Sequence, residues 1–131
     1  MINVILADDH SLVRDGIKAL LEESTDIKVI AEASNGTEAL ELSASLKPHI
    51  LIVDIRMPGL SGIQTVSRLS HESPDVKALV LSMHDSEEYV LQSVESGAYG
   101  YLLKDTTRDE FIKAIHTINR GEKYFSADIA T

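Results

Sequence analysis

The chain has 131 residues, 44% of them hydrophobic, which suffices for one domain with a buried core. It has no cysteine, which excludes a disulfide framework and thiolate metal sites and fits a reducing compartment, and no apolar run is long enough to cross a membrane. Its net charge of −9 opposes binding to nucleic acid phosphates, so we expect this chain by itself not to contact DNA. From its cysteine usage and the lack of a visible membrane or secretory segment, we expect a cytoplasmic domain with no membrane contact.

Apolar runs recur along the chain and are separated by stretches with helical patterning. The runs are nearly continuous rather than alternating, which is typical of parallel strands buried on both faces. This alternation of strands and helices predicts a doubly wound α/β domain, a (βα)5 arrangement around a five-stranded parallel sheet. The predicted strands are Ile2–Ala7, Ile27–Ala33, Ile50–Val53, Lys77–Leu81 and Tyr99–Leu103.

Helix signals lie between the predicted strands. Apolar residues between Leu12 and Leu21 form one stripe, and Asn35 can cap the next helix. Thr107 and Glu110 have the spacing of a capping box ahead of the last helix, which should end at Gly121. The residues after Gly121 form a short tail that suits the start of a linker.

Chemically capable side chains stand at the ends of four predicted strands. Asp8 and Asp9 follow the first strand, and Asp54 closes the third. Ser82 follows the fourth strand, and Lys104 follows the fifth. If the strands are parallel, these side chains converge on one edge of the sheet, where open α/β sheets place their sites.

Three carboxylates gathered at one edge would repel one another, by about 4 kcal/mol for a pair 4 Å apart at an effective dielectric constant near 20. Such a cluster either keeps a proton or binds a cation, and an oxygen-only ligand set is the one that Mg²⁺ prefers. Taken singly, each acid has an ordinary interpretation, with Asp8 and Asp9 at a helix start and Asp54 as a loop acid. Their combination favours a magnesium site.

Asp54 is the best candidate nucleophile, because a carboxylate can attack a phosphoryl group and form an aspartyl phosphate. Mg²⁺ held by Asp9 and Asp54 would bind one phosphoryl oxygen, the Lys104 ammonium another, and the Ser82 hydroxyl a third. A plain surface role for Lys104 is weakened by its place directly after a buried strand. Tyr101 is either a core residue or an aromatic that changes position when Ser82 moves.

The motifs at the strand ends are Ala7-Asp8-Asp9-His10, Val53-Asp54-Ile55-Arg56-Met57-Pro58-Gly59, Leu81-Ser82 and Lys104. In order, spacing and chemistry they are similar to those of the receiver domain of two-component response regulators, and the resemblance runs from Met1 to about Gly121. The stretch 97–105 and the opening 7–10 look most like the NarL/FixJ (LuxR-type) subfamily. The resemblance implies a flavodoxin-like or CheY-like fold.

By this resemblance, Asp54 would be the phosphoacceptor, and Ser82 and Lys104 would bind the phosphoryl group. Tyr101 would be the aromatic residue that switches together with Ser82.

The same resemblance implies a metal site and two residues that tune the phosphoryl lifetime. Asp9 and Asp54 would ligate Mg²⁺ directly, Asp8 would act through water, and the Arg56 backbone carbonyl would add a ligand. The side chains of Arg56 and His84 would occupy the two variable positions that set how long the phosphoryl group persists.

As a function, the resemblance implies a phosphorylation switch that receives its phosphoryl group from a sensor histidine kinase and controls transcription. Residues 1–121 would form the receiver domain, and 122–131 would start a linker to a C-terminal helix-turn-helix domain that this chain lacks. Phosphorylation would promote a homodimer, and DNA would be contacted only through the missing domain. The domain would catalyse only its own phosphorylation and dephosphorylation.

Other hypotheses remain open at this point. The chain could be a degenerate or single-domain receiver that acts by protein binding alone. A phosphatase similar to haloacid dehalogenases would need an acid at position 56, where the chain has Arg56, and a flavodoxin-like binding module would need a phosphate loop where Asp8 and Asp9 stand. Asp105 stands where many receivers have proline, which leaves the isomer of the Lys104–Asp105 bond open.

Overall fold

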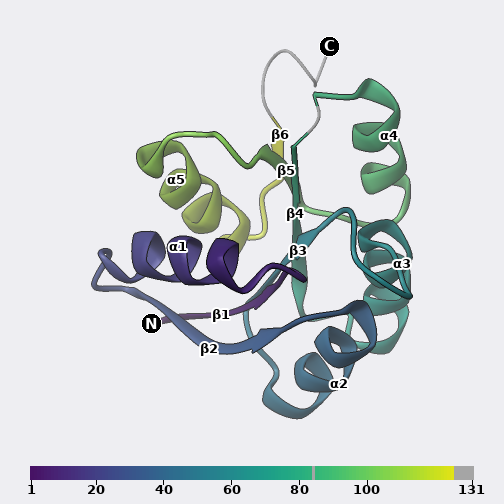
Figure 1. Ribbon diagram of the computed structural model, residues 1–131, viewed down its shortest axis with the longest axis horizontal. Helices are drawn as coiled ribbons and strands as arrows, with labels where there is room; N and C mark the ends of the chain where they lie inside the picture. Colours follow the sequence, from purple (N-terminus) through teal and green to yellow (C-terminus); the bar gives the residue numbers. More distant parts are fainter. Residues whose placement is uncertain (84, 126–131) are drawn as a thin grey trace.

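The computed structural model describes residues 1–83 and 85–125, in which a parallel sheet lies between two layers of helices (Figure 1). Helices α1 and α5 cover one face of the sheet, and α2, α3 and α4 cover the other, so the predicted doubly wound α/β fold is confirmed. The strands are β1 Ile2–Ala7, β2 Ile27–Ala33, β3 Ile50–Asp54, β4 Lys77–Ser82, β5 Gly100–Leu103 and β6 Tyr124–Phe125. The helices are α1 Ser11–Glu22, α2 Gly36–Leu46, α3 Gly62–Glu72, α4 Glu87–Glu95 and α5 Arg108–Asn119.

The strand order β2-β1-β3-β4-β5-β6 places a topological switch point between β1 and β3. In the register of the sheet, Ala7 lies beside Val53, and Asp54 lies beside Leu81. The residues that follow β1, β3 and β4 therefore leave the sheet at the same edge.

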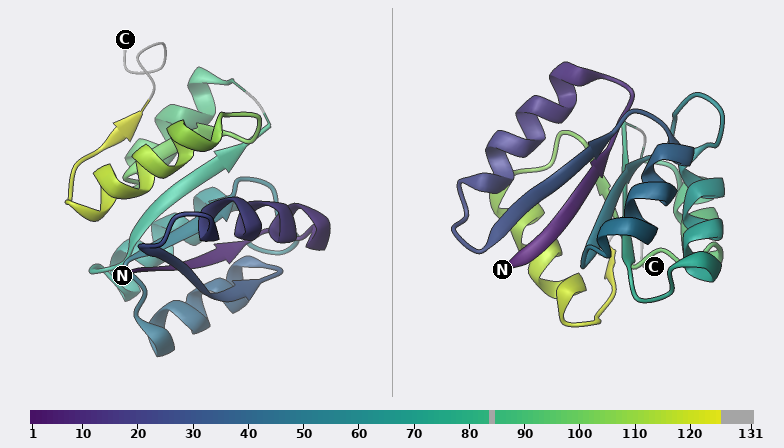
Figure 2. Two further views of the ribbon diagram at one scale, coloured as in Figure 1. Left: turned by 90° about the vertical axis from the view of Figure 1, so that its left-hand side faces the viewer. Right: turned by 90° about the horizontal axis from the view of Figure 1, so that it is seen from below.

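Each face of the sheet buries its own apolar core, which is why the strands read as continuous apolar runs. Ile5, Leu51 and Val80 pack in the core under α2, α3 and α4. Leu6 and Ile52, whose side chains point to the opposite face, pack in the core under α1 and α5, which lie side by side in Figure 2. Burying such a side chain fully stabilises the fold by about 1.5–3 kcal/mol, so the two cores anchor the central strands from both faces.

The sheet has six strands among the described residues rather than the predicted five. Tyr124 and Phe125 pair in parallel with Gly100 and Tyr101 and extend the sheet beyond β5. A two-residue strand has no apolar pattern of its own, so this part of the expected linker could not be distinguished from a tail. Glycine is required at position 100, because a Cβ there would lie 2.8 Å from the Tyr124 carbonyl oxygen.

Two predicted helix starts are present, one of them in a different form. The Asn35 side chain accepts a hydrogen bond from the Glu38 amide at 2.8 Å, and Thr107 caps α5 through the Glu110 amide at 3.2 Å. The Glu110 carboxylate does not complete the predicted capping box in the described part of the chain; it accepts the Tyr124 hydroxyl at 2.8 Å instead.

The Lys104–Asp105 peptide bond is trans, because the described residues contain no cis peptide. Over residues 1–83 and 85–125, no helix is both long and apolar enough to cross a membrane.

Candidate functional site

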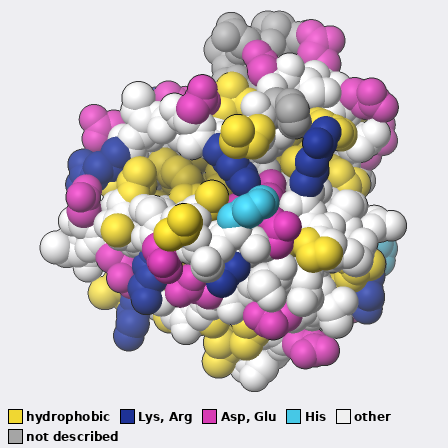
Figure 3. All heavy atoms as spheres, in the orientation of Figure 1, with side chains coloured by type: hydrophobic (Ala, Val, Ile, Leu, Met, Phe, Trp, Pro, Cys, Tyr) yellow, Lys and Arg dark blue, Asp and Glu magenta, His cyan; other side chains and the backbone are white. Residues whose placement is uncertain are grey.

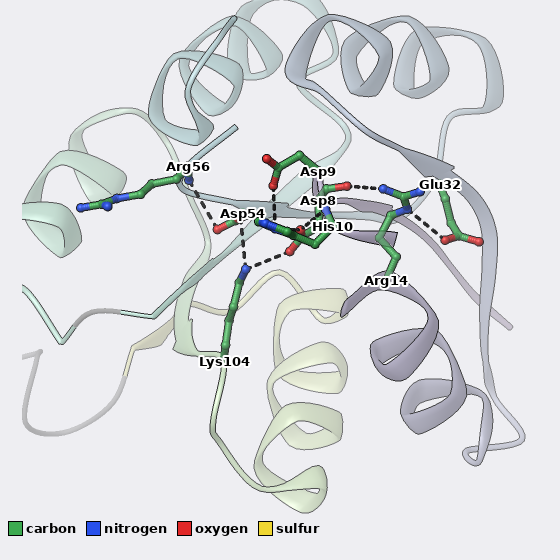
Figure 4. Close-up of polar contacts among 8 residues, drawn as sticks. All are labelled: Asp8, Asp9, His10, Arg14, Glu32, Asp54, Arg56 and Lys104. Atoms are coloured by element: carbon green, nitrogen blue, oxygen red, sulfur yellow. Dashed lines mark hydrogen bonds and ion pairs between the residues drawn. The ribbon is translucent and has the colours of Figure 1, made fainter. Parts of the chain in front are cut away.

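The carboxyl ends of β1, β3, β4 and β5 bring the predicted site residues together at one edge of the sheet. Asp8 and Asp9 come directly after β1, Asp54 and Ser82 are the last residues of β3 and β4, and Lys104 comes directly after β5. Figure 4 shows Asp8, Asp54 and Lys104 pointing toward one another from three separate strand ends. The parallel topology thus creates the convergence that the sequence predicts.

The Lys104 ammonium lies between two buried carboxylates. Its Nζ is 2.9 Å from Asp8 Oδ2 and 3.1 Å from Asp54 Oδ2. Asp8 is 1% exposed and Asp54 is 5% exposed, while the Lys104 side chain is 12% exposed. Because these charges are removed from water, both carboxylates depend on the Lys104 ammonium for stabilisation.

Burial by itself favours the neutral forms of both Asp54 and Lys104, which means a higher pKa for the acid and a lower pKa for the base. Burial raises the pKa of Asp54, although the ammonium of Lys104 partly opposes this, and the neighbouring Asp8 adds to the increase. Burial alone would lower the pKa of Lys104, but its hydrogen bond to Asp8 and the charge of Asp54 outweigh burial and raise it. Lys104 therefore stays charged, whereas the ionised form of Asp54 is held at a cost.

Hydrogen bonds hold both the backbone and the side chain of Asp8, whereas the side chain of Asp9 is more exposed. The Asp8 backbone amide donates to the Ala33 carbonyl at 3.0 Å, and its Oδ1 accepts the His10 backbone amide at 2.8 Å. Asp9 is next to it in the chain, with a side chain that is 32% exposed and 2.9 Å from the His10 ring. Asp8 thus serves as a fixed buried acid, and Asp9 faces the space above it.

This group of residues fits a divalent cation by its donor chemistry. Ligand atoms of Asp8, Asp9, His10 and Asp54 all lie within 4.8 Å of one another. Three of the four donors are carboxylates, which suit Mg²⁺, Ca²⁺ or Mn²⁺, and Mg²⁺ binds through one or two carboxylates while keeping several waters.

A pocket of about 330 Å³ opens above the cluster. Figure 3 shows a histidine flanked by basic and acidic side chains near the middle of this face of the molecule. An anionic group that entered the pocket would meet the Lys104 ammonium beside the Asp54 carboxylate. The lining residues are Asp9, His10, Asp54, Ile55, Arg56, Met57, Met83 and Lys104.

Ser82 and Tyr101 are fully buried, and neither is among the described residues that line this pocket. Burial raises the pKa of the Tyr101 hydroxyl, and a side-chain hydrogen bond with Ser82 partly opposes that increase. The predicted pair of switch residues is therefore in direct contact, with Ser82 at the end of β4 and Tyr101 within the neighbouring strand β5.

Arg56 lies at the rim of the pocket with its side chain turned away from Asp54 (Figure 4). Its backbone amide is 3.4 Å from Asp54 Oδ1, and its guanidinium donates to the Tyr89 hydroxyl on α4 at 3.3 Å. His84, the other residue expected to tune phosphoryl lifetime, lies outside the described residues.

Sequence reasoning missed a second charged pair beside the acidic cluster. Arg14 of α1 donates through Nη1 to the Asp8 carbonyl oxygen and through Nε to Glu32 Oε1 at 3.2 Å. Nothing in the spacing of a helical arginine and a strand glutamate 18 residues later indicates that they meet. Only the packing of α1 against β2 brings them together.

Comparison with known proteins decides the family. Residues 4–116 match the family model of the response regulator receiver domain. The chain belongs to this family. It is 43% identical over 128 residues to the transcriptional regulatory protein MctR of Rhizobium johnstonii, covering 98% of this chain and 60% of MctR. It is 39% identical over 123 residues to the nitrate/nitrite response regulator protein NarL of Escherichia coli, covering 94% of this chain and 57% of NarL.

A solved structure agrees with these relatives. The signal receiver domain of a response regulator NarL from Mycobacterium tuberculosis superimposes with a TM-score of 0.89 at 36% identity, covering 92% of this chain and 98% of that one. The chain is therefore a receiver domain of the NarL type, and the phosphatase and flavodoxin hypotheses are not supported. It spans about 60% of the length of the curated relatives it matches.

Proposed function

We propose that this domain is a phosphorylation-activated switch in which Asp54 accepts a phosphoryl group from a sensor histidine kinase. The observation that carries the proposal is the position of the Asp54 carboxylate, which lies 3.1 Å from the Lys104 ammonium and lines a pocket of about 330 Å³. Membership of the receiver family agrees with this function.

In the transfer, a carboxylate oxygen of Asp54 forms a bond to phosphorus as the bond from phosphorus to the kinase histidine nitrogen breaks. The nitrogen keeps the electron pair of the broken bond, and the imidazole leaves as the neutral ring from the form of phosphohistidine that carries a proton on its other ring nitrogen. Lys104 neutralises charge on one phosphoryl oxygen, and the Ser82 hydroxyl donates to another.

A magnesium ion fits this assignment. Asp9 and Asp54 would bind it directly, Asp8 through water, and Arg56 through its backbone carbonyl. When bound, Mg²⁺ supplies positive charge to a phosphoryl oxygen and offsets the repulsion between the carboxylates. The protein itself orients the acidic side chains. Its core excludes water from the side of Asp54 that faces away from the pocket.

The switch would begin at the contact between Ser82 and Tyr101. A phosphoryl group on Asp54 attracts the Ser82 hydroxyl, which then exchanges its hydrogen bond to Tyr101 for one to the new anion. Tyr101 would repack, and α4, which contacts β5, would change its outer surface. Arg56 and His84 would set the lifetime of this state, Arg56 from the pocket rim.

The output lies beyond this domain. We infer that residues 122–131 lead toward a C-terminal helix-turn-helix domain, that phosphorylation favours a homodimer, and that DNA is bound only through that further domain. Among the described residues of this stretch, 124–125 belong to the sheet. A receiver that acts by protein binding alone remains the alternative, and it predicts no phosphoryl adduct.

The test is an intact-mass measurement after incubation with Mg²⁺ and acetyl phosphate. We expect wild-type protein to gain one phosphoryl group, Asp54→Asn to gain none, and chelation of Mg²⁺ to abolish the gain. Asp75→Asn is the matched control, because Asp75 is exposed and precedes β4 at the opposite edge of the sheet. No adduct on wild type, or an adduct that persists in Asp54→Asn, would contradict the proposal.

A further inference from the structure

Arg14 connects three elements next to the site without touching the pocket. Its side chain is only 18% exposed, although it carries a full charge. One end of the guanidinium donates to the Asp8 carbonyl oxygen and the other to the carboxylate of Glu32 on β2. Figure 4 shows Arg14 on the far side of the acidic turn, which we define as residues 8–10, from Lys104.

These contacts fix the peptide group that joins Asp8 to Asp9. The Asp8 carbonyl oxygen belongs to the planar Asp8–Asp9 peptide unit, so restraining it restrains the direction in which the Asp9 backbone leaves the strand. The Asp8 carboxylate is already held by Lys104 and by the His10 amide. The Asp9 carboxylate has weaker support within the acidic turn, where it contacts the exposed ring of His10.

We propose that Arg14 is a positioning residue for Mg²⁺ binding, which aims the Asp9 carboxylate at the cation by holding the Asp8 carbonyl, with Glu32 keeping Arg14 in place. This inference rests on the proposed function, because it assigns Asp9 as a direct ligand. Groups that orient metal ligands from behind affect affinity strongly, and their loss costs about 10–100-fold in metal binding.

The sign of the effect separates positioning from simple electrostatics. Arg14 is a cation close to the site, so removing its charge alone should tighten the binding of Mg²⁺. Removing the support of the acidic turn should weaken that binding. A role limited to tying α1 to the sheet would lower the melting temperature and leave the affinity for Mg²⁺ unchanged.

The experiment measures the dissociation constant for Mg²⁺ alone by isothermal titration calorimetry, together with the melting temperature in chelator. We expect about tenfold weaker binding for Arg14→Met, which keeps a good helix former in α1, and a similar loss for Arg14→Lys, which cannot span both partners. Glu32→Gln should weaken binding less, in the same direction. Arg68→Met on α3 is the matched control, since Arg68 is exposed and pairs with Glu72.

Phosphorylation from acetyl phosphate supplies a second reading. If Arg14 acts through the metal site, saturating Mg²⁺ should restore the rate of Arg14→Met toward that of wild type. Unchanged or tighter Mg²⁺ binding in Arg14→Met would overturn the inference. If that variant does not fold, unchanged binding in both Arg14→Lys and Glu32→Gln would overturn it equally.

Failure of the inference can be told apart from failure of the proposed function. Normal phosphorylation of wild type with unaltered Mg²⁺ affinity in the Arg14 variants would leave the function standing and remove the role of Arg14. Weaker Mg²⁺ binding in those variants, with no phosphoryl adduct on wild type, would leave Arg14 as a positioning residue of a metal site whose purpose is different.

Discussion

Two ion pairs in this domain have the same length and opposite surroundings. Lys104 Nζ lies 2.9 Å from Asp8 Oδ2, and Arg68 Nε lies 2.9 Å from Glu72 Oε2. The first pair is 12% and 1% exposed, while the second is 53% and 46% exposed. Distance alone therefore says nothing about what each pair contributes.

The difference lies in the cost of removing the charges from water. In the exposed pair of α3, water solvates both partners, and the pairing adds little. In the buried cluster, removing Asp8 and Asp54 from water costs several kcal/mol for each carboxylate. Only the charge of Lys104 offsets this cost among the described residues that contact both of them. Such a cluster does little for net stability compared with well-packed apolar residues of similar volume.

The largest effect that this comparison predicts comes from Lys104→Met. The substitution leaves two buried carboxylates facing each other, and breaking a buried pair in this way costs about 3–5 kcal/mol. Chemical denaturation at neutral pH in chelator measures the loss in the free energy of unfolding. Mg²⁺ should restore part of the stability, because it binds the folded protein and replaces the missing charge.

Combining Lys104→Met with Asp54→Asn is the control. Removing one of the two orphaned charges should recover a large part of the loss, so the two substitutions are not additive. Strict additivity would show that the loss came from packing around the lysine stem rather than from unpaired charge.

Asp54→Asn is expected to stabilise the domain, by less than Lys104→Met destabilises it. The pKa of Asp54 is raised above its ordinary value of 3.8, mainly by burial, so the folded protein holds this proton more tightly than the unfolded chain does. The domain therefore loses stability as pH rises from the ordinary pKa of Asp54 through its raised pKa in the folded protein. The asparagine variant lacks this loss and should melt higher than wild type at neutral pH, by a few degrees if the gain is about 1 kcal/mol.

Thermal unfolding of both proteins from acid to neutral pH in chelator tests this sign. The advantage of Asp54→Asn should widen as pH rises. An asparagine variant that is less stable than wild type at neutral pH would mean that attraction to Lys104 outweighs burial.

Tyr124 provides an intermediate case, a partly buried neutral donor to a charged acceptor. Burial and the Glu110 carboxylate raise the pKa of Tyr124 to about 12 from an ordinary value of 10.0. The folded state favours the protonated hydroxyl, so its contribution is fully present below pH 10 and is lost as pH rises toward 12. Tyr124→Phe should cost about 1 kcal/mol at neutral pH and should abolish that pH dependence.

Ultraviolet titration of tyrosinate in wild type and Tyr124→Phe measures this directly. The variant should lack one phenol that titrates near pH 12 in the folded protein. Loss of a phenol that titrates near pH 10 instead would show that the bond to Glu110 does not persist in solution.

Much of the site follows from the sequence, because its positions are set by strand ends. The apolar runs define the strands, and parallel strands must bring their carboxyl ends to one edge, so the strand pattern alone places Asp8, Asp54 and Lys104 together. No such rule governs side chains from different elements, and the pairing of Arg14 with Glu32 depends on how α1 packs. Strand β6 could not be predicted for a related reason, since two residues have no periodicity.

The smallest loss of stability is expected for Arg68→Ala, which removes the exposed ion pair. This substitution removes a charged partner at the same distance as in the buried cluster, on a helix where water can solvate Glu72. An exposed pair four residues apart on a helix contributes about 0.3–0.5 kcal/mol, and salt screens it further. Denaturation at low and high salt should show a loss below about 0.5 kcal/mol that shrinks with salt. A loss near that of Lys104→Met would mean that burial does not set the value of an ion pair in this domain.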